Sequence, residues 1–108
     1  MRLGIREHID CAHFLPGHAR CGQLHGHTYR VEIVIVGEAK DGMLMDFADL
    51  KQEVRAVLAR YDHRSWNEFL DYPSVENICE RLAGDLRERL AFAFTIRVYE
   101  GFGKWAEL

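Results

Sequence analysis

The chain has 108 residues, with 14 basic and 17 acidic side chains and a formal net charge of −3. This balance argues against a nucleic-acid partner, because a phosphate backbone attracts proteins with a basic surface. No stretch approaches the roughly 18 apolar residues of a membrane helix, and the first residues lack the apolar centre of a signal peptide. We therefore expect a cytoplasmic protein that contacts neither nucleic acid nor membrane.

The length fits a single domain over residues 1–108, and a domain this small gains from burying apolar surface in an oligomer. Its three cysteines, Cys11, Cys21 and Cys79, are an odd number, which with no secretion signal indicates reduced thiols. At least one thiol is then available for chemistry.

The first half of the chain predicts two strands and a long connection. Residues 5–13 are expected to form one strand and residues 28–37 another, since apolar residues alternate from Tyr29 to Ile35 and β-branched residues occupy both faces. The loop 14–24 between them is long for a compact domain, and such loops are usually functional.

At Asp46 the apolar period changes to three and four residues, which predicts an amphipathic helix with Asp46 as its N-cap. Its apolar stripe consists of Phe47, Leu50, Val54, Val57, Leu58 and Tyr61. A second helix is expected after Ser74, its N-cap, with the stripe Val75, Ile78, Leu82, Leu86 and Leu90.

Alternation returns at Phe94, Ile96 and Val98 and predicts a late strand. Strands followed by helices and a further strand indicate an α+β domain, with the helices packed on one face of an antiparallel sheet.

Residues 21–27 read CGQLHGH and carry candidate metal ligands. His25 and His27 point to the same side of an extended chain, because the side-chain period of a strand is two. His13 supplies a third imidazole if the first two strands pair, although the spacing leaves His8 and His18 open as alternatives. Three neutral imidazoles with an open fourth position are typical of a catalytic Zn²⁺ site.

Cys21 precedes the histidine pair in the same segment. A thiol beside a dication favours its thiolate form and becomes a base or nucleophile, whereas a buried cysteine is usually an inert small hydrophobe. The pattern alone leaves both interpretations open for Cys21. Cys11 within a strand and Cys79 on the apolar side of a helix are expected to be structural.

Two further sites carry carboxylates. Asp62 next to His63 offers an acid/base imidazole if the backbone bends enough for the two side chains to meet; the alternative is a solvated helix end. Glu100 ends the late strand, where it is either solvated or pairs with the guanidine-like edge of a heterocycle.

Five segments in order resemble the 6-pyruvoyltetrahydropterin synthase and 6-carboxytetrahydropterin synthase family over nearly the whole chain: DCAHFLP, CGQLHGH, YDHRSWN, PSVEN and VYEGFGKWAEL. The resemblance implies a role for each matching residue. It implies zinc on His13, His25 and His27, a catalytic Cys21, a proton relay of Asp62 and His63, and pterin contacts from Glu100 and Ser74.

The same resemblance implies a tunnelling fold, with a four-stranded antiparallel sheet and two helices on one face. It further implies a homohexamer built as a dimer of trimers, with active sites between subunits and 7,8-dihydroneopterin triphosphate as substrate.

The short gap between Cys21 and the histidines resembles the 6-carboxy-5,6,7,8-tetrahydropterin synthases of queuosine and 7-deazapurine biosynthesis, lyases that release acetaldehyde and triphosphate. Two alternatives are a 6-pyruvoyltetrahydropterin synthase or other pterin side-chain lyase, and a non-catalytic zinc-stabilised oligomer that binds a purine or pterin.

Overall fold

Two long strands form one side of the sheet in the computed structural model, which describes residues 1–108. Strand β1 (Arg2–His13) pairs antiparallel with β2 (His25–Val36), from Arg2 opposite Val36 to His13 opposite His25. Both strands are longer than the sequence predicts, and β2 begins three residues before the predicted start at residue 28. His25 and His27 therefore lie within a regular strand.

The sheet has four antiparallel strands in the order β1-β2-β3-β4. Strand β3 (Ala93–Glu100) is the predicted late strand, and β4 (Lys104–Glu107) returns along it through a turn. Four residues are too few to show a period, so the pattern did not predict β4. The four-stranded antiparallel sheet implied by the resemblance is confirmed.

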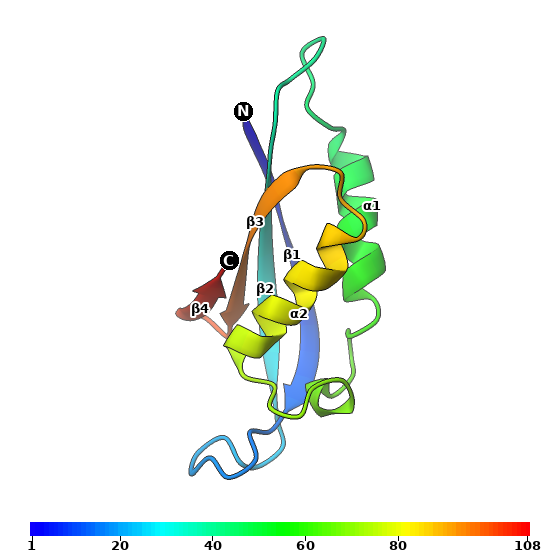
Figure 1. Ribbon diagram of the computed structural model, residues 1–108. Coiled ribbons are helices and arrows are strands. Elements are labelled where there is room, and N and C mark those ends of the chain that lie inside the picture. The colour runs from blue at the N-terminus through cyan, green and yellow to red at the C-terminus, as the bar shows by residue number, and fades with distance from the viewer.

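Both helices, α1 (Phe47–Leu58) and α2 (Val75–Arg87), cover one face of the sheet (Figure 1). Both predicted caps are confirmed. The Asp46 carboxylate accepts the Ala48 N–H at 2.7 Å, and the Ser74 hydroxyl accepts the Asn77 N–H at 3.2 Å. No helix has the length and hydropathy needed to span a bilayer.

One core of twenty buried residues fills the space between helices and sheet. It takes Leu50, Val54, Val57 and Leu58 from α1, the stripe from Ile78 to Leu86 from α2, and alternate residues of the strands. Phe47 was expected in the buried stripe, and this is wrong. Its side chain is 56% exposed, because the first helical position faces an open apolar groove beside Met1 and Met43.

The uncovered face of the sheet carries charged side chains in pairs. Arg6 binds Glu32 at 2.5 Å and Arg97 binds Glu107 at 2.7 Å. This face is therefore polar, as expected for a sheet packed by helices on one side only.

The chain that follows α1 is tied back to β1. The His63 N–H donates to the Asp10 carbonyl at 2.7 Å, and the Asp10 N–H donates to the Asp62 carboxylate at 3.0 Å. Partial burial opposes ionisation of Asp62, but hydrogen bonds and charges from Asp10, His63 and Arg55 outweigh it and hold the pKa of this carboxyl below its ordinary value.

Beyond this tie lies a short 3-10 helix, η1 (Trp66–Glu68), closed by a capping box between Ser65 and Glu68. Trp66 is buried and stacks on Tyr61 with ring centroids 4.5 Å apart. Residues 61–68 are thus anchored by the buried Tyr61 and Trp66, while the side chains of His63 and Arg64 stay exposed.

Leu50→Ala is expected to lower the free energy of unfolding by about 2–5 kcal/mol, because it empties a fully buried position. Phe47→Ala, in the same helix, should lower it by less than about 1 kcal/mol. Urea denaturation at one protein concentration measures both. Equal losses would contradict the burial of these two side chains.

Asp62→Asn is expected to be less stable than the parent chain at neutral pH, with a gap that closes at acid pH. A carboxyl with a lowered folded-state pKa contributes stability above its unfolded pKa and loses that contribution as pH falls. The gap should therefore narrow below about pH 4. Denaturation curves between pH 7 and pH 3 measure this, and a gap independent of pH would contradict it.

Candidate metal centre and catalytic residues

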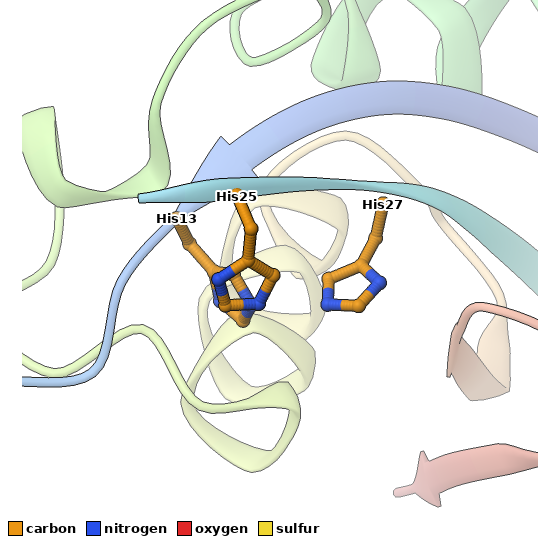
Figure 2. A group of neighbouring side chains, drawn as sticks. All are labelled: His13, His25 and His27. Atoms are coloured by element: carbon orange, nitrogen blue, oxygen red, sulfur yellow. The ribbon is translucent and has the colours of Figure 1, made fainter. Parts of the chain in front are cut away.

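Three histidines converge at the end of the β1–β2 pair (Figure 2). His13 and His25 are direct cross-strand partners, and His27 follows two residues later on the same face of β2. One ring nitrogen from each lies within 4.8 Å of the other two, and the Nε2 atoms of His13 and His25 are 3.1 Å apart. The structure thus brings together His13, His25 and His27, the residues proposed as ligands.

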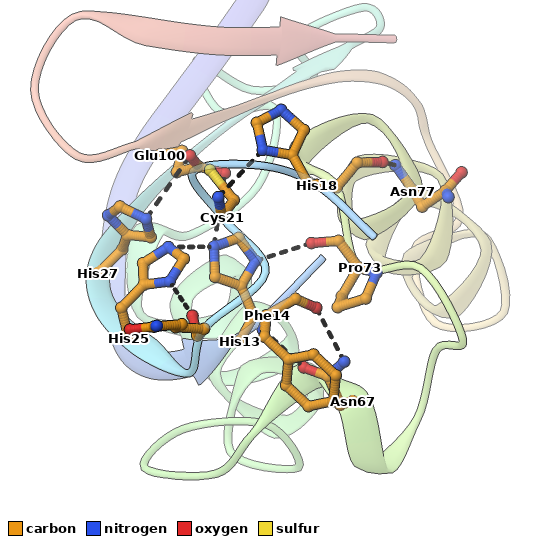
Figure 3. A network of polar contacts seen from close by, with 12 residues as sticks. His13, Phe14, His18, Cys21, His25, His27, Asn67, Pro73, Asn77 and Glu100 are labelled. Carbon is orange, nitrogen blue, oxygen red and sulfur yellow. Dashed lines mark hydrogen bonds and ion pairs between the residues drawn. The ribbon is translucent and has the colours of Figure 1, made fainter. Parts of the chain in front are cut away.

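Backbone carbonyls orient two of these rings (Figure 3). The Nδ1 of His13 lies 2.8 Å from the carbonyl of Pro73, and the Nδ1 of His25 lies 2.7 Å from that of Gln23. A carbonyl only accepts, so each Nδ1 carries the proton and each Nε2 presents a lone pair. Two lone pairs that face each other at this distance repel, and a cation bound between them would relieve that repulsion.

His27 completes the donor set. Its Nε2 is buried and makes no hydrogen bond, while the nearest carboxylate oxygen, Oε1 of Glu100, is 3.6 Å away. Burial lowers the pKa of His27, Glu100 opposes that shift, and the imidazoles of His13 and His25 add to it. His27 is therefore neutral near pH 7, which is the form that binds a metal.

Glu100 borders this cluster as the last residue of β3. Its carboxylate lies 4.0 Å from Nε2 of His13 and is only 15% exposed, so it is not a solvated strand end. Gly101 follows with φ of 69°, a left-handed conformation that suits glycine, and its N–H donates to the carbonyl of Thr28 at 3.2 Å. The turn thus fixes Glu100 beside the histidines.

Cys21 sits in the loop that leads into β2. The Leu15 N–H donates to its carbonyl at 2.6 Å, and its own N–H donates to Nδ1 of His18 at 3.0 Å. Its thiol is half-buried and forms no disulfide. His18, an alternative third ligand in the sequence, thus closes the loop, and His8 lies on the opposite face of β1 from His13.

The other two thiols are inert. Burial raises the pKa of Cys11 to about 12 and that of Cys79 to about 11. The expectation that both are structural is confirmed by their exposure, 5% and 1%.

Asp62 and His63 form a second cluster with Asp10. His63 takes φ of 63°, and this bend brings its Nδ1 to 2.9 Å from the Asp62 carboxylate. The cluster adjoins the Asp10 side chain, which alternation places on the other face of β1 from His13. Within one chain, this pair therefore does not join the three histidines.

Several groups that support the site were not predicted from the sequence. Asn67 clamps the residue after His13 through two hydrogen bonds of 2.9 Å, one from the Phe14 N–H and one to the Phe14 carbonyl. The carbonyls of Pro73 and Gln23 carry no residue-type signal at all. The Ser74 hydroxyl, predicted as a substrate contact, accepts the Asn77 N–H as the cap of α2.

A family model described as 6-pyruvoyl tetrahydropterin synthase matches residues 2–108. A putative 6-carboxy-5,6,7,8-tetrahydropterin synthase from Archaeoglobus fulgidus is 44% identical over 109 residues, covering 100% of this chain and 95% of that protein. A dihydroneopterin monophosphate aldolase from Pyrococcus furiosus is 38% identical over 89 residues, covering 82% of this chain and 77% of that protein.

Among solved structures, the 6-pyruvoyl tetrahydropterin synthase of Caenorhabditis elegans superimposes with a TM-score of 0.90 at 20% identity, over 100% of this chain and 94% of that chain. The Plasmodium vivax protein of the same name gives 0.86 at 20% identity, over 100% and 96%. This likeness shows a shared fold, the tunnelling fold. With the sequence match along its whole length, the chain belongs to the 6-pyruvoyl tetrahydropterin synthase family.

Proposed function

We propose that the chain is a zinc-dependent 6-carboxy-5,6,7,8-tetrahydropterin synthase. It would convert 7,8-dihydroneopterin triphosphate and water to 6-carboxytetrahydropterin, acetaldehyde and triphosphate. The convergence of three imidazole lone pairs beside the loop that carries Cys21 supports this proposal most directly. The match to an archaeal relative of that name over the whole chain selects the reaction.

Zn²⁺ fits the three histidines. In a tetrahedral site with Zn–N bonds of about 2.0–2.1 Å, ligand nitrogens lie about 3.3 Å apart, close to the 3.1 Å between His13 and His25. When bound there, the metal would act as a Lewis acid on side-chain oxygens of the substrate and make the adjacent C–H acidic.

The chain's own residues would then move protons and hold the substrate. The Cys21 thiolate would remove the acidic proton, and His63, held by Asp62, would exchange protons with side-chain hydroxyls. Glu100 would pair with the aminopyrimidine edge of the pterin, with Ser74 contacting the same ring system.

Because His63 lies apart from the metal cluster within one chain, the site needs a second subunit. The outer edges of β4 and of β1 ahead of His8 leave hydrogen-bonding groups unpaired, and pairing β1 of one subunit with β4 of the next would cover both edges. Three subunits would close a barrel lined by the uncovered face of the sheet, which carries the ion pairs Arg6–Glu32 and Arg97–Glu107. Two such trimers would form a homohexamer.

A second candidate is a different cleavage of the same side chain. The 38% identity to an archaeal dihydroneopterin monophosphate aldolase favours it. A retro-aldol cleavage needs the same acidified side chain and general base but yields a hydroxymethyl pterin rather than a carboxy pterin. A 6-pyruvoyl product would be the third outcome of the same site chemistry.

The metal assignment predicts one zinc per chain in the parent protein and loss of that zinc in His13→Ala. His8→Ala is the matched control, since His8 leaves the same strand on the opposite face and should keep full zinc. Atomic absorption after gel filtration measures both. Zinc retained by His13→Ala in a folded protein would contradict the ligand set.

Chelation separates a catalytic metal from a structural one. A catalytic site should leave a folded and inactive oligomer after zinc removal, whereas a zinc-stabilised binding module should lose its fold. Circular dichroism and sedimentation of the chelated protein make this distinction.

Mass analysis of products from 7,8-dihydroneopterin triphosphate tests the reaction. We expect acetaldehyde and the 6-carboxy pterin, with turnover in Cys21→Ala lower by at least about 100-fold, because a general base contributes that much. Cys79→Ala removes a buried thiol remote from the loop and should retain turnover.

If the product were a hydroxymethyl or pyruvoyl pterin, the assignment of the site residues would stand and the assigned reaction would be replaced. Full turnover in zinc-loaded Cys21→Ala would show that another group removes the proton.

A further inference from the structure

Arg55 joins three parts of the structure from the last turn of α1. One of its terminal nitrogens donates to the carbonyl of His8 at 2.9 Å, and the other donates to Oδ2 of Asp62 at 3.4 Å. Its Nε lies 3.7 Å from the carboxylate of Glu7. The guanidinium is thus anchored on β1 while one of its edges faces Asp62.

The Asp62 carboxylate is held on both oxygens. Oδ1 accepts the Asp10 N–H at 3.0 Å and lies 2.9 Å from Nδ1 of His63, while Oδ2 faces Arg55. Arg55 therefore restrains the oxygen that does not contact the imidazole. Without Arg55, only the Asp10 N–H and the imidazole would hold the carboxylate, both through Oδ1, and its rotation about the last torsion would be less restrained.

His63 depends on this contact because little else orients its ring. Its side chain is 78% exposed, so packing does not fix the ring. A carboxylate at Nδ1 selects the tautomer with the proton on Nδ1, which leaves the Nε2 lone pair free to accept a proton from a substrate.

We propose that Arg55 is a positioning residue that fixes the Asp62 carboxylate and thereby sets the tautomer and direction of His63. The effect of Arg55 on turnover rests on the proposed function, in which His63 exchanges protons with the substrate. The effect of Arg55 on the tautomer of His63 does not rest on the proposed function.

Other charged groups surround the pair without contacting Oδ2. They face it from α1, from β1, from the turn that leads to η1 and from η1 itself: Lys51, Glu7, His8, Asp10, Arg64 and Glu68. Arg64 is occupied by Glu68 at 2.7 Å. Arg55 is therefore the basic side chain that holds the Asp62 carboxylate.

A merely structural Arg55 would fasten α1 to β1 through the His8 carbonyl. The experiment must therefore read the imidazole directly. ¹⁵N solid-state NMR of the histidine-labelled full chain reports the tautomer of each ring, and the signal of His63 is assigned by its loss in His63→Asn.

We expect neutral His63 of the parent chain to be the Nδ1–H form. In Arg55→Gln, Nε2–H should become the major form, and kcat should fall about tenfold with KM within about twofold. Arg55→Lys keeps the charge but cannot reach both His8 and Asp62, so it should shift the same way to a smaller extent.

Arg89→Gln is the matched control. Arg89 also pairs with a carboxylate on α1, Glu53 at 2.9 Å, and its side chain is 35% exposed against 34% for Arg55, but it does not touch Asp62. It should leave the tautomer and kcat unchanged.

Unchanged tautomers in both Arg55 variants, with circular dichroism showing native folding, would overturn the proposal. So would a tautomer shift of equal size in Arg89→Gln. If the parent chain turns over no pterin, the proposed function fails, while the tautomers still decide the role of Arg55.

Discussion

The antiparallel register of β1 and β2 is the constraint on which the rest of the molecule depends. It runs without a bulge from Arg2 opposite Val36 to His13 opposite His25. Its alternation puts Ile9, Tyr29 and their neighbours into the core and three histidines at the end of the same face. A slip of one residue would turn both the core and the histidines to the other face, so the forces that bury the core also build the metal centre.

This arrangement places a polar side chain inside the core. His13 is fully buried, and an unsatisfied imidazole there would be destabilising. The Pro73 carbonyl accepts a hydrogen bond from Nδ1 of His13, and Nε2 of the same ring faces His25. That carbonyl lies just before the N-cap of α2, so the helix that covers the sheet also orients the ring. The position of α2 therefore also determines which nitrogen of His13 carries the proton.

Much of this was predictable because period and residue type are local properties. The strand period put His25 and His27 on one side, and Asp46 and Ser74 marked both helix starts. The choice of His13 over His8 and His18 needed the strand register, which spacing cannot give. Carbonyl acceptors and the Asn67 clamp depend on backbone positions far apart in sequence, so residue type carries no sign of them.

The conformation of His63 argues that Asp62 and His63 serve more than the fold. A left-handed backbone costs a residue with a side chain about 1–2 kcal/mol, and glycine would avoid that cost in an exposed turn. The ring of His63 is mostly exposed, so it gains little from packing. The strained bend does bring its Nδ1 to 2.9 Å from the Asp62 carboxylate. An exposed imidazole whose Nδ1 is held by a carboxylate, in a turn that is hydrogen-bonded to β1, is suited to act on a molecule bound against a neighbouring subunit.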